Sequence, residues 1–148
     1  MNDKLNRRKS GGVSFLDGGR GDPFVLLHGI PGSSLTWHGV ATQLTDSFRV
    51  IVPDLLGFGE SDSPEGDYYM QAQAVAIKQL LDTLRIRSLY LAGHDFGGPV
   101  AITLLRLFPE LQLRGLVLSN TNVFTDTFVP LPLRSAKVPM LGSLVFKA

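Results

Sequence analysis

LYLAGHDFGGPVA, residues 89 to 101, is the stretch that decides the fold of this chain. Leu89 to Ala92 is an apolar run of strand length, and Pro99 suits the first turn of a following helix. Between them, Gly93 to Gly97 has the spacing G-x-nucleophile-x-G, which is typical of a sharp strand-to-helix turn with a strained central residue. A side chain at either glycine would collide with the backbone of so tight a turn. The central residue is Asp95, and we interpret its carboxylate as the group that carries out the chemistry of this protein.

Strand and helix signals alternate on both sides of this turn. Short apolar runs predict strands at Val13–Asp17, Phe24–Leu27, Phe48–Pro53, Leu89–Ala92 and Leu116–Ser119. Apolar periodicity, a serine cap at Ser33 or Ser34, and prolines predict helices at 35–44, 68–86 and 99–108. In the longest helix the apolar stripe is Met70, Ala74, Ile77, Leu81 and Leu84, and the solvent side is Gln73, Lys78, Asp82 and Arg85.

This alternation predicts an α/β fold, with a mainly parallel sheet, right-handed crossovers and helices on both faces. Ligand sites of such sheets lie beyond the carboxyl ends of the strands. Sequence order places four polar residues there, which are His28, Asp54, Asp95 and Asn120.

Composition limits the classes of function. The chain has 148 residues, 44% of them hydrophobic, which is enough for one globular core. A net charge of +1 argues against nucleic acid as a partner, and the absence of cysteine excludes disulfides and thiolate metal sites. No apolar run has the length of a membrane span, and the basic start runs into glycines rather than a signal sequence. We therefore expect a flexible tail over residues 1–12, a cytoplasmic protein and no membrane partner. The loop at 57–62 lacks the third glycine and the helix of a dinucleotide site, and no cofactor or metal is expected.

Three motifs together resemble the α/β-hydrolase family, in its branch with an aspartate nucleophile. They are HGIP at residues 28–31, DLLGFGES at residues 54–61 and GHDFGG at residues 93–98. The resemblance covers residues 13–120, the N-terminal part of the family's core. It implies that residues 121–148 begin the cap, and that the later strands, helices and most of the cap are missing.

The resemblance also implies roles for individual residues. Asp95 is the nucleophile, and the backbone N–H groups of Ile30 and Phe96 form the oxyanion hole. The residues expected to support this geometry are His28, Gly29, Pro31, Gly93, His94, Gly97 and Gly98. Because a carboxylate is ionised at neutral pH, it can attack an sp³ carbon and form an alkyl–enzyme ester without a base.

Hydrolysis of that ester needs a histidine base, which the family places after the nucleophile together with an acid. This chain has only His28, His38 and His94, all before Asp95. We expect His28 to support the oxyanion loop, His38 to serve the surface or helix packing, and the His94 side chain to point away from the turn. The expected protein is therefore a fragment that forms the ester but does not turn over. A truncated frame, an excised piece and half of a two-chain enzyme remain the alternatives, with self-association or pairing to a missing C-terminal half through the open sheet edge.

The choice within the branch rests on the residues beside the turn. Haloalkane dehalogenases use side-chain donors that Ile30 and Phe96 lack, and haloacetate dehalogenases use an arginine where Phe96 stands. Epoxide hydrolases match the motifs better, although their activating tyrosines lie in the cap and no tyrosine follows Tyr90. An epoxide hydrolase-like enzyme acting on a small apolar organic substrate is the first hypothesis. A haloalkane dehalogenase-like enzyme and a non-catalytic binding protein of this fold are the alternatives.

Overall fold

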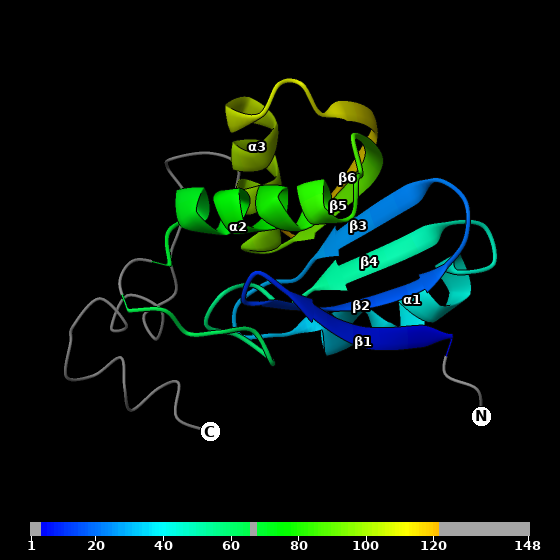
Figure 1. Cartoon of the computed structure of the whole chain (residues 1–148), viewed down its shortest axis with the longest axis horizontal. Helices are drawn as coiled ribbons and strands as arrows, with labels where there is room; N and C mark the ends of the chain where they lie inside the picture. The colour runs from blue at the N-terminus through cyan, green and yellow to red at the C-terminus, as the bar shows by residue number, and fades with distance from the viewer. Residues whose placement is uncertain (1–3, 66–67, 122–148) are drawn as a thin grey trace.

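A six-stranded sheet carries the molecule, with strand order β1-β2-β4-β3-β5-β6 (Figure 1). The structure is a computed structural model that describes residues 4–65 and 68–121. The strands are β1 (Leu5–Ser10), β2 (Val13–Gly19), β3 (Pro23–Leu27), β4 (Arg49–Pro53), β5 (Ser88–His94) and β6 (Gln112–Ser119). The helices are η1 (Ser34–Trp37), α1 (His38–Leu44), α2 (Met70–Thr83) and α3 (Gly97–Leu107). Strands β4, β3, β5 and β6 run parallel to one another, whereas β2 pairs antiparallel with both β1 and β4, so the predicted mainly parallel α/β sheet is confirmed.

Helices cover both faces of the sheet, because successive side chains of a strand point to opposite faces. In β3, Val25 and Leu27 belong to one buried cluster and Leu26 to the other. The first cluster lies under α2 and α3, and the second lies under η1 and α1 (Figure 1). The continuous apolar run of β3 is thus explained by burial on both sides.

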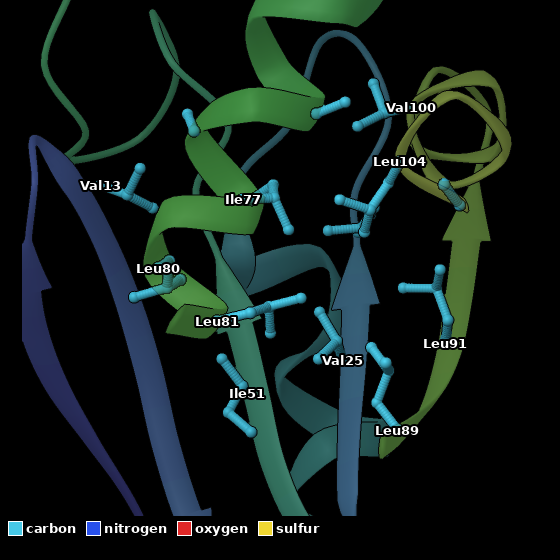
Figure 2. Packing of buried hydrophobic residues seen from close by; sticks show 14 of the residues in the cluster. Val13, Val25, Ile51, Ile77, Leu80, Leu81, Leu89, Leu91, Val100 and Leu104 are labelled. Carbon is cyan, nitrogen blue, oxygen red and sulfur yellow. The ribbon is translucent and has the colours of Figure 1, made fainter. Parts of the chain in front are cut away.

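The larger cluster fixes the position of the turn that follows β5 (Figure 2). Side chains of four strands, β2 to β5, meet those of α2 and α3 there, and the buried residues include Val13, Val25, Ile51, Leu89, Leu91, Ile77, Leu81, Val100 and Leu104. Since α3 packs on this cluster through Val100 and Leu104, its first turn is held at the carboxyl end of β5.

Three expectations from the sequence were wrong. Residues 5–10 are not a flexible tail, because β1 pairs antiparallel with β2 from Leu5 opposite Gly18 to Ser10 opposite Val13. Gln73 is not on the solvent side of α2, because its side chain is fully buried and bonds both backbone groups of Leu56. Met70, predicted in the apolar stripe, is 36% exposed at the first turn of the helix.

Strand β6 presents an apolar edge. Among the described residues it pairs only with β5, and its exposed apolar side chains are Leu113, Leu116, Val117 and Leu118. Exposed apolar surface beside an unpaired edge favours association. Pairing through this edge stays a prediction, and the predicted cap at 121–148 lies outside the described residues except for Thr121.

Candidate active site

Asp95 occupies the strained turn that the sequence predicts. It lies between the end of β5 and the start of α3 with φ of +49°, a backbone conformation that costs a non-glycine residue energy. Both polar groups of its backbone bond to residues at the end of β6. Ser119 accepts from its N–H at 3.2 Å, and its carbonyl accepts from the Thr121 hydroxyl at 2.6 Å. Thr121, which the sequence reasoning missed, therefore ties the turn to the end of β6.

Glycine is required where α3 meets β3. A Cβ atom at Gly97 would lie 2.7 Å from the carbonyl carbon of Leu27 and 2.8 Å from the oxygen of His28. Gly93 and Gly98 are similarly crowded, by Gly97 and by Thr121 respectively. These contacts show that the start of α3 is pressed against the end of β3, which brings Asp95 close to the loop after His28.

The loop after β3 reaches the Asp95 carboxylate directly. The backbone N–H of Ile30 donates to Asp95 Oδ2 at 2.8 Å, across 65 positions of sequence. A Cβ at Gly29 would lie 2.6 Å from the same oxygen, so only glycine leaves room for this approach. The Ile30–Pro31 peptide bond is cis. The structure thus brings together Gly29, Ile30 and Asp95, as the sequence reasoning expected.

Phe96 is the N-cap residue of α3, with its side chain packed against the larger core cluster. The N–H groups at a helix start have no partner within the helix, and the helix dipole places partial positive charge there. An anion beside Asp95 would be stabilised by this charge. The role of the Phe96 N–H as a second oxyanion donor stays a prediction.

The three histidines lie in different surroundings. His28 is fully buried, with Nδ1 2.8 Å from the Gly29 oxygen and Nε2 3.0 Å from the Leu55 nitrogen. His94 meets Trp37 edge-on, with ring centroids 6.4 Å apart, and its buried Nδ1 has no hydrogen-bond partner in the described part of the chain. His38 is the first residue of α1. His28 therefore contacts the backbone of Gly29 and Leu55, and its role in supporting the oxyanion loop stays a prediction.

Asp54 is committed to structure rather than exposed at the predicted ligand edge. Its side chain is fully buried and accepts from the N–H of Ser34 at 2.5 Å and from that of Glu60 at 3.0 Å. Arg7 of β1 pairs with Asp54 Oδ2 at 2.8 Å and also donates to the Ser34 hydroxyl at 3.0 Å. Arg7 lies in the segment predicted as a tail, so the sequence reasoning missed it. Asp54 thus joins β1, the start of η1 and the loop at 57–60.

The pKa values of three buried groups are shifted. Burial alone would raise the pKa of Asp54, but the N–H donors of Glu60 and Ser34 and the charge of Arg7 outweigh burial and lower it. Asp17 follows the same pattern, with burial outweighed by Arg49 and Arg8. Burial lowers the pKa of His28 despite the opposing effects of the Gly29 carbonyl and of Asp54. The fold therefore stabilises the ionised form of Asp54 and Asp17 and the neutral form of His28, which are the forms that predominate at neutral pH.

Acidification is expected to weaken the fold in two steps. Below pH 6.5, the ordinary pKa of histidine, the unfolded chain binds a proton that native His28 resists, so the free energy of unfolding falls. Its slope reaches at most about 1.4 kcal/mol per pH unit for one proton. Below the ordinary aspartate pKa of 3.8, the unfolded chain protonates carboxylates that Asp54 and Asp17 keep ionised, and stability falls again.

Urea denaturation across this pH range measures both steps. His28→Asn, which does not titrate, should remove the first step and keep the second. A free energy of unfolding that stays constant as the pH falls through 6.5 would contradict the assignment to His28.

Among the described residues, no group of three or more histidine, aspartate or glutamate side chains is placed to hold a metal ion. No helix within residues 4–65 and 68–121 is both long enough and apolar enough to cross a membrane. The expected absence of a cofactor stays a prediction.

Comparison with known proteins agrees with this geometry. The sequence matches the family model described as alpha/beta hydrolase fold over residues 22–144. Human epoxide hydrolase 4 is 32% identical over 139 residues, which is 88% of this chain and 38% of that protein. Haloalkane dehalogenase 2 of Mycobacterium tuberculosis is 35% identical over 112 residues, which is 75% of this chain and 39% of that protein.

Two further relatives extend the range. The cis-3-alkyl-4-alkyloxetan-2-one decarboxylase of Shewanella oneidensis is 31% identical over 147 residues, covering 95% of this chain and 46% of that protein. The solved structure of epoxide hydrolase CorEH superposes with a TM-score of 0.80 at 25% identity, over 97% of this chain and 56% of that one. The chain spans less than half the length of the curated relatives that it matches.

Proposed function

Because this chain belongs to the alpha/beta hydrolase fold family, we propose that Asp95 is the nucleophile of an epoxide hydrolase-like enzyme. A carboxylate oxygen of Asp95 bonds to a ring carbon of the epoxide, the carbon–oxygen bond of the ring breaks, and the alkoxide takes a proton from water. The product is an alkyl–enzyme ester. The substrate class is a small apolar epoxide.

The observation that carries this proposal is the hydrogen bond from Ile30 N–H to Asp95 Oδ2, at a residue held at positive φ. One carboxylate oxygen is thereby oriented, which leaves the other to face a substrate. When water later attacks the ester carbonyl, negative charge develops on the carbonyl oxygen, where the amides of Ile30 and Phe96 would stabilise it. The start of α3 would add the field of its dipole.

The fate of the ester depends on a base. General-base catalysis contributes about 10²–10⁴ in rate. Both nitrogens of His28 contact backbone groups, and every histidine of this sequence precedes Asp95. We therefore propose that the chain of 148 residues accumulates the ester instead of releasing it.

A carbon–halide substrate is the second candidate, since haloalkane dehalogenase 2 is 35% identical over its matched part. The side chains of Ile30 and Phe96 offer no donor for a leaving halide, which favours the epoxide. A four-membered lactone is a further probe, because one relative is named as an oxetan-2-one decarboxylase.

Intact mass after incubation with styrene oxide, butyl bromide or a dialkyl oxetan-2-one tests the proposal. The epoxide and the lactone add their whole mass, whereas the bromide adds its mass less that of hydrogen bromide. We expect one adduct per chain, formed in the highest yield with the epoxide. Peptide sequencing should locate it on Asp95. Asp95→Asn should abolish it, and Asp82→Asn, at an exposed carboxylate of α2, should not. An adduct that survives in Asp95→Asn, or no adduct in a protein shown to be folded, favours a binding protein of this fold.

A further inference from the structure

The peptide unit that joins Gly29 and Ile30 is bonded at both of its polar groups. Its carbonyl oxygen lies 2.8 Å from His28 Nδ1, and its N–H donates to Asp95 Oδ2 at 2.8 Å. The C=O and N–H of a planar trans peptide point in opposite directions within one plane. Whatever fixes the carbonyl of Gly29 therefore also fixes the direction of the Ile30 N–H.

The contacts of His28 determine which of its nitrogens carries the proton. The N–H of Leu55 can only donate, so Nε2, 3.0 Å away, must be the unprotonated acceptor. The carbonyl of Gly29 can only accept, so the proton of the neutral ring lies on Nδ1. Leu55 follows β4, and the ring therefore bridges the carboxyl ends of β3 and β4.

The surroundings leave the ring little freedom. Its side chain is fully buried, and the Phe58 ring meets it edge-on with centroids 5.9 Å apart. The loop folds back over it at Gly32, where a Cβ atom would lie 2.8 Å from the Gly29 oxygen and 3.5 Å from His28 Nδ1. A rigid ring with a single allowed tautomer can hold a peptide plane in one orientation.

We propose that His28 is a positioning residue, whose Nδ1 proton holds the Gly29 carbonyl so that the Ile30 N–H is aimed at the Asp95 carboxylate. This inference rests on the proposed function for its effect on rate, but not for its geometry. His28 touches neither substrate nor Asp95, and it acts through the peptide plane alone.

Two substitutions separate the two hydrogen bonds of the ring. In His28→Asn the amide nitrogen is as many bonds from Cα as Nδ1 is, so a donor toward Gly29 is kept and the acceptor for Leu55 is lost. In His28→Gln the amide oxygen is as many bonds from Cα as Nε2 is, so the acceptor is kept and the donor is lost. If His28 served only the stability of the loop, both substitutions would slow ester formation about equally.

The experiment measures the rate and half-saturation of ester formation with styrene oxide. His28→Gln is expected to slow the maximal rate about 10- to 100-fold with little change in the half-saturating concentration of styrene oxide. The change disturbs the orientation of the Ile30 N–H and not the binding of the substrate. His28→Asn should stay within about threefold of the unsubstituted protein, because the donor is kept. His38→Gln, the same change at the start of α1, is the matched control and should not alter the rate.

Nuclear magnetic resonance tests the geometry without any substrate. The imidazole nitrogen spectrum should show the His28 proton on Nδ1. Asp95→Asn should shift the Ile30 amide signal, and His28→Gln should shift it similarly while His28→Asn does not. A proton on Nε2, an unmoved Ile30 signal in His28→Gln, or equal slowing by both variants would overturn the proposal. If no adduct forms at all, the proposed function fails while these spectra still decide the role of His28, and the tautomer is read from the unsubstituted protein even if a variant does not fold.

Discussion

Asp54→Ala is expected to lower the free energy of unfolding by about 3–5 kcal/mol, the usual cost of removing one partner from a buried ion pair. The change leaves the N–H groups of Ser34 and Glu60 without their acceptor, and it leaves Arg7 charged, only 26% exposed and without its carboxylate partner at this position. Domains of this size have total stabilities of about 5–15 kcal/mol, so the variant should be partly unfolded at 37 °C or close to it. Urea denaturation followed by circular dichroism measures the loss.

Asp82→Ala is the matched control for this prediction. Asp82 pairs with Lys78 at 2.7 Å on the surface of α2, and its side chain is 54% exposed. Exposed pairs contribute about 0–1 kcal/mol, so its removal should change stability little. Arg7→Ala combined with Asp54→Ala should cost less than the sum of the two single changes, because neither charge is then left unpaired. If Asp54→Ala lowers the free energy of unfolding no more than Asp82→Ala does, Asp54 does not stabilise the fold in the way proposed.

Local sequence signals predicted those parts of the fold that depend on local physics. The turn at Asp95 requires glycine at Gly93 and Gly97, and both requirements are visible in the spacing of the motif. The apolar run of β3 and the periodicity of α2 likewise reflect burial of adjacent residues. The contact between Ile30 and Asp95 is not local, and the sequence pointed to it only through the resemblance to the α/β-hydrolase family.

Strand β1 was missed because its sequence LNRRKS is polar. Edge strands rich in charge are common in proteins, since charge discourages pairing with another molecule. A signal was present in Gly11 and Gly12, which both have positive φ and form the two-residue turn between β1 and β2. The partner of Arg7 could not be predicted, because Asp54 lies 47 positions away and only the finished sheet brings them together.

Gln73 was misplaced for a related physical reason. Helical periodicity separates apolar from polar residues, but it does not indicate that a buried amide will find matching backbone groups. Here the amide oxygen accepts from Leu56 N at 2.8 Å and the amide nitrogen donates to Leu56 O at 2.9 Å. Both polar atoms are satisfied by a loop distant in sequence, so the burial costs little. The sequence analysis therefore failed where long-range polar pairing decides the position of a side chain.

Gly29→Ala is expected to slow ester formation at Asp95 by about 100-fold or more, since displacements near 1 Å at a reacting group have effects of that order. The added Cβ atom would lie 2.5 Å from Asp95 Cβ and 2.6 Å from Oδ2, so the carboxylate and the loop must move apart. The hydrogen bond from Ile30 N–H to Oδ2 is then stretched or lost. Stability should fall by only about 1–3 kcal/mol, as for other overpacked sites.

Gly39→Ala separates this steric effect from the general effect of replacing glycine. Gly39 lies in α1, and a Cβ atom there would have no heavy atom within 4 Å. The control should therefore react at the unsubstituted rate and gain about 0.4–1 kcal/mol of stability, because alanine restricts the unfolded chain. Intact mass against time with styrene oxide compares the three proteins, with urea denaturation run on the same samples. Ester formation in Gly29→Ala at the rate of Gly39→Ala would mean that close contact between the loop and Asp95 is not needed for attack, and that the carboxylate reacts without the Ile30 amide.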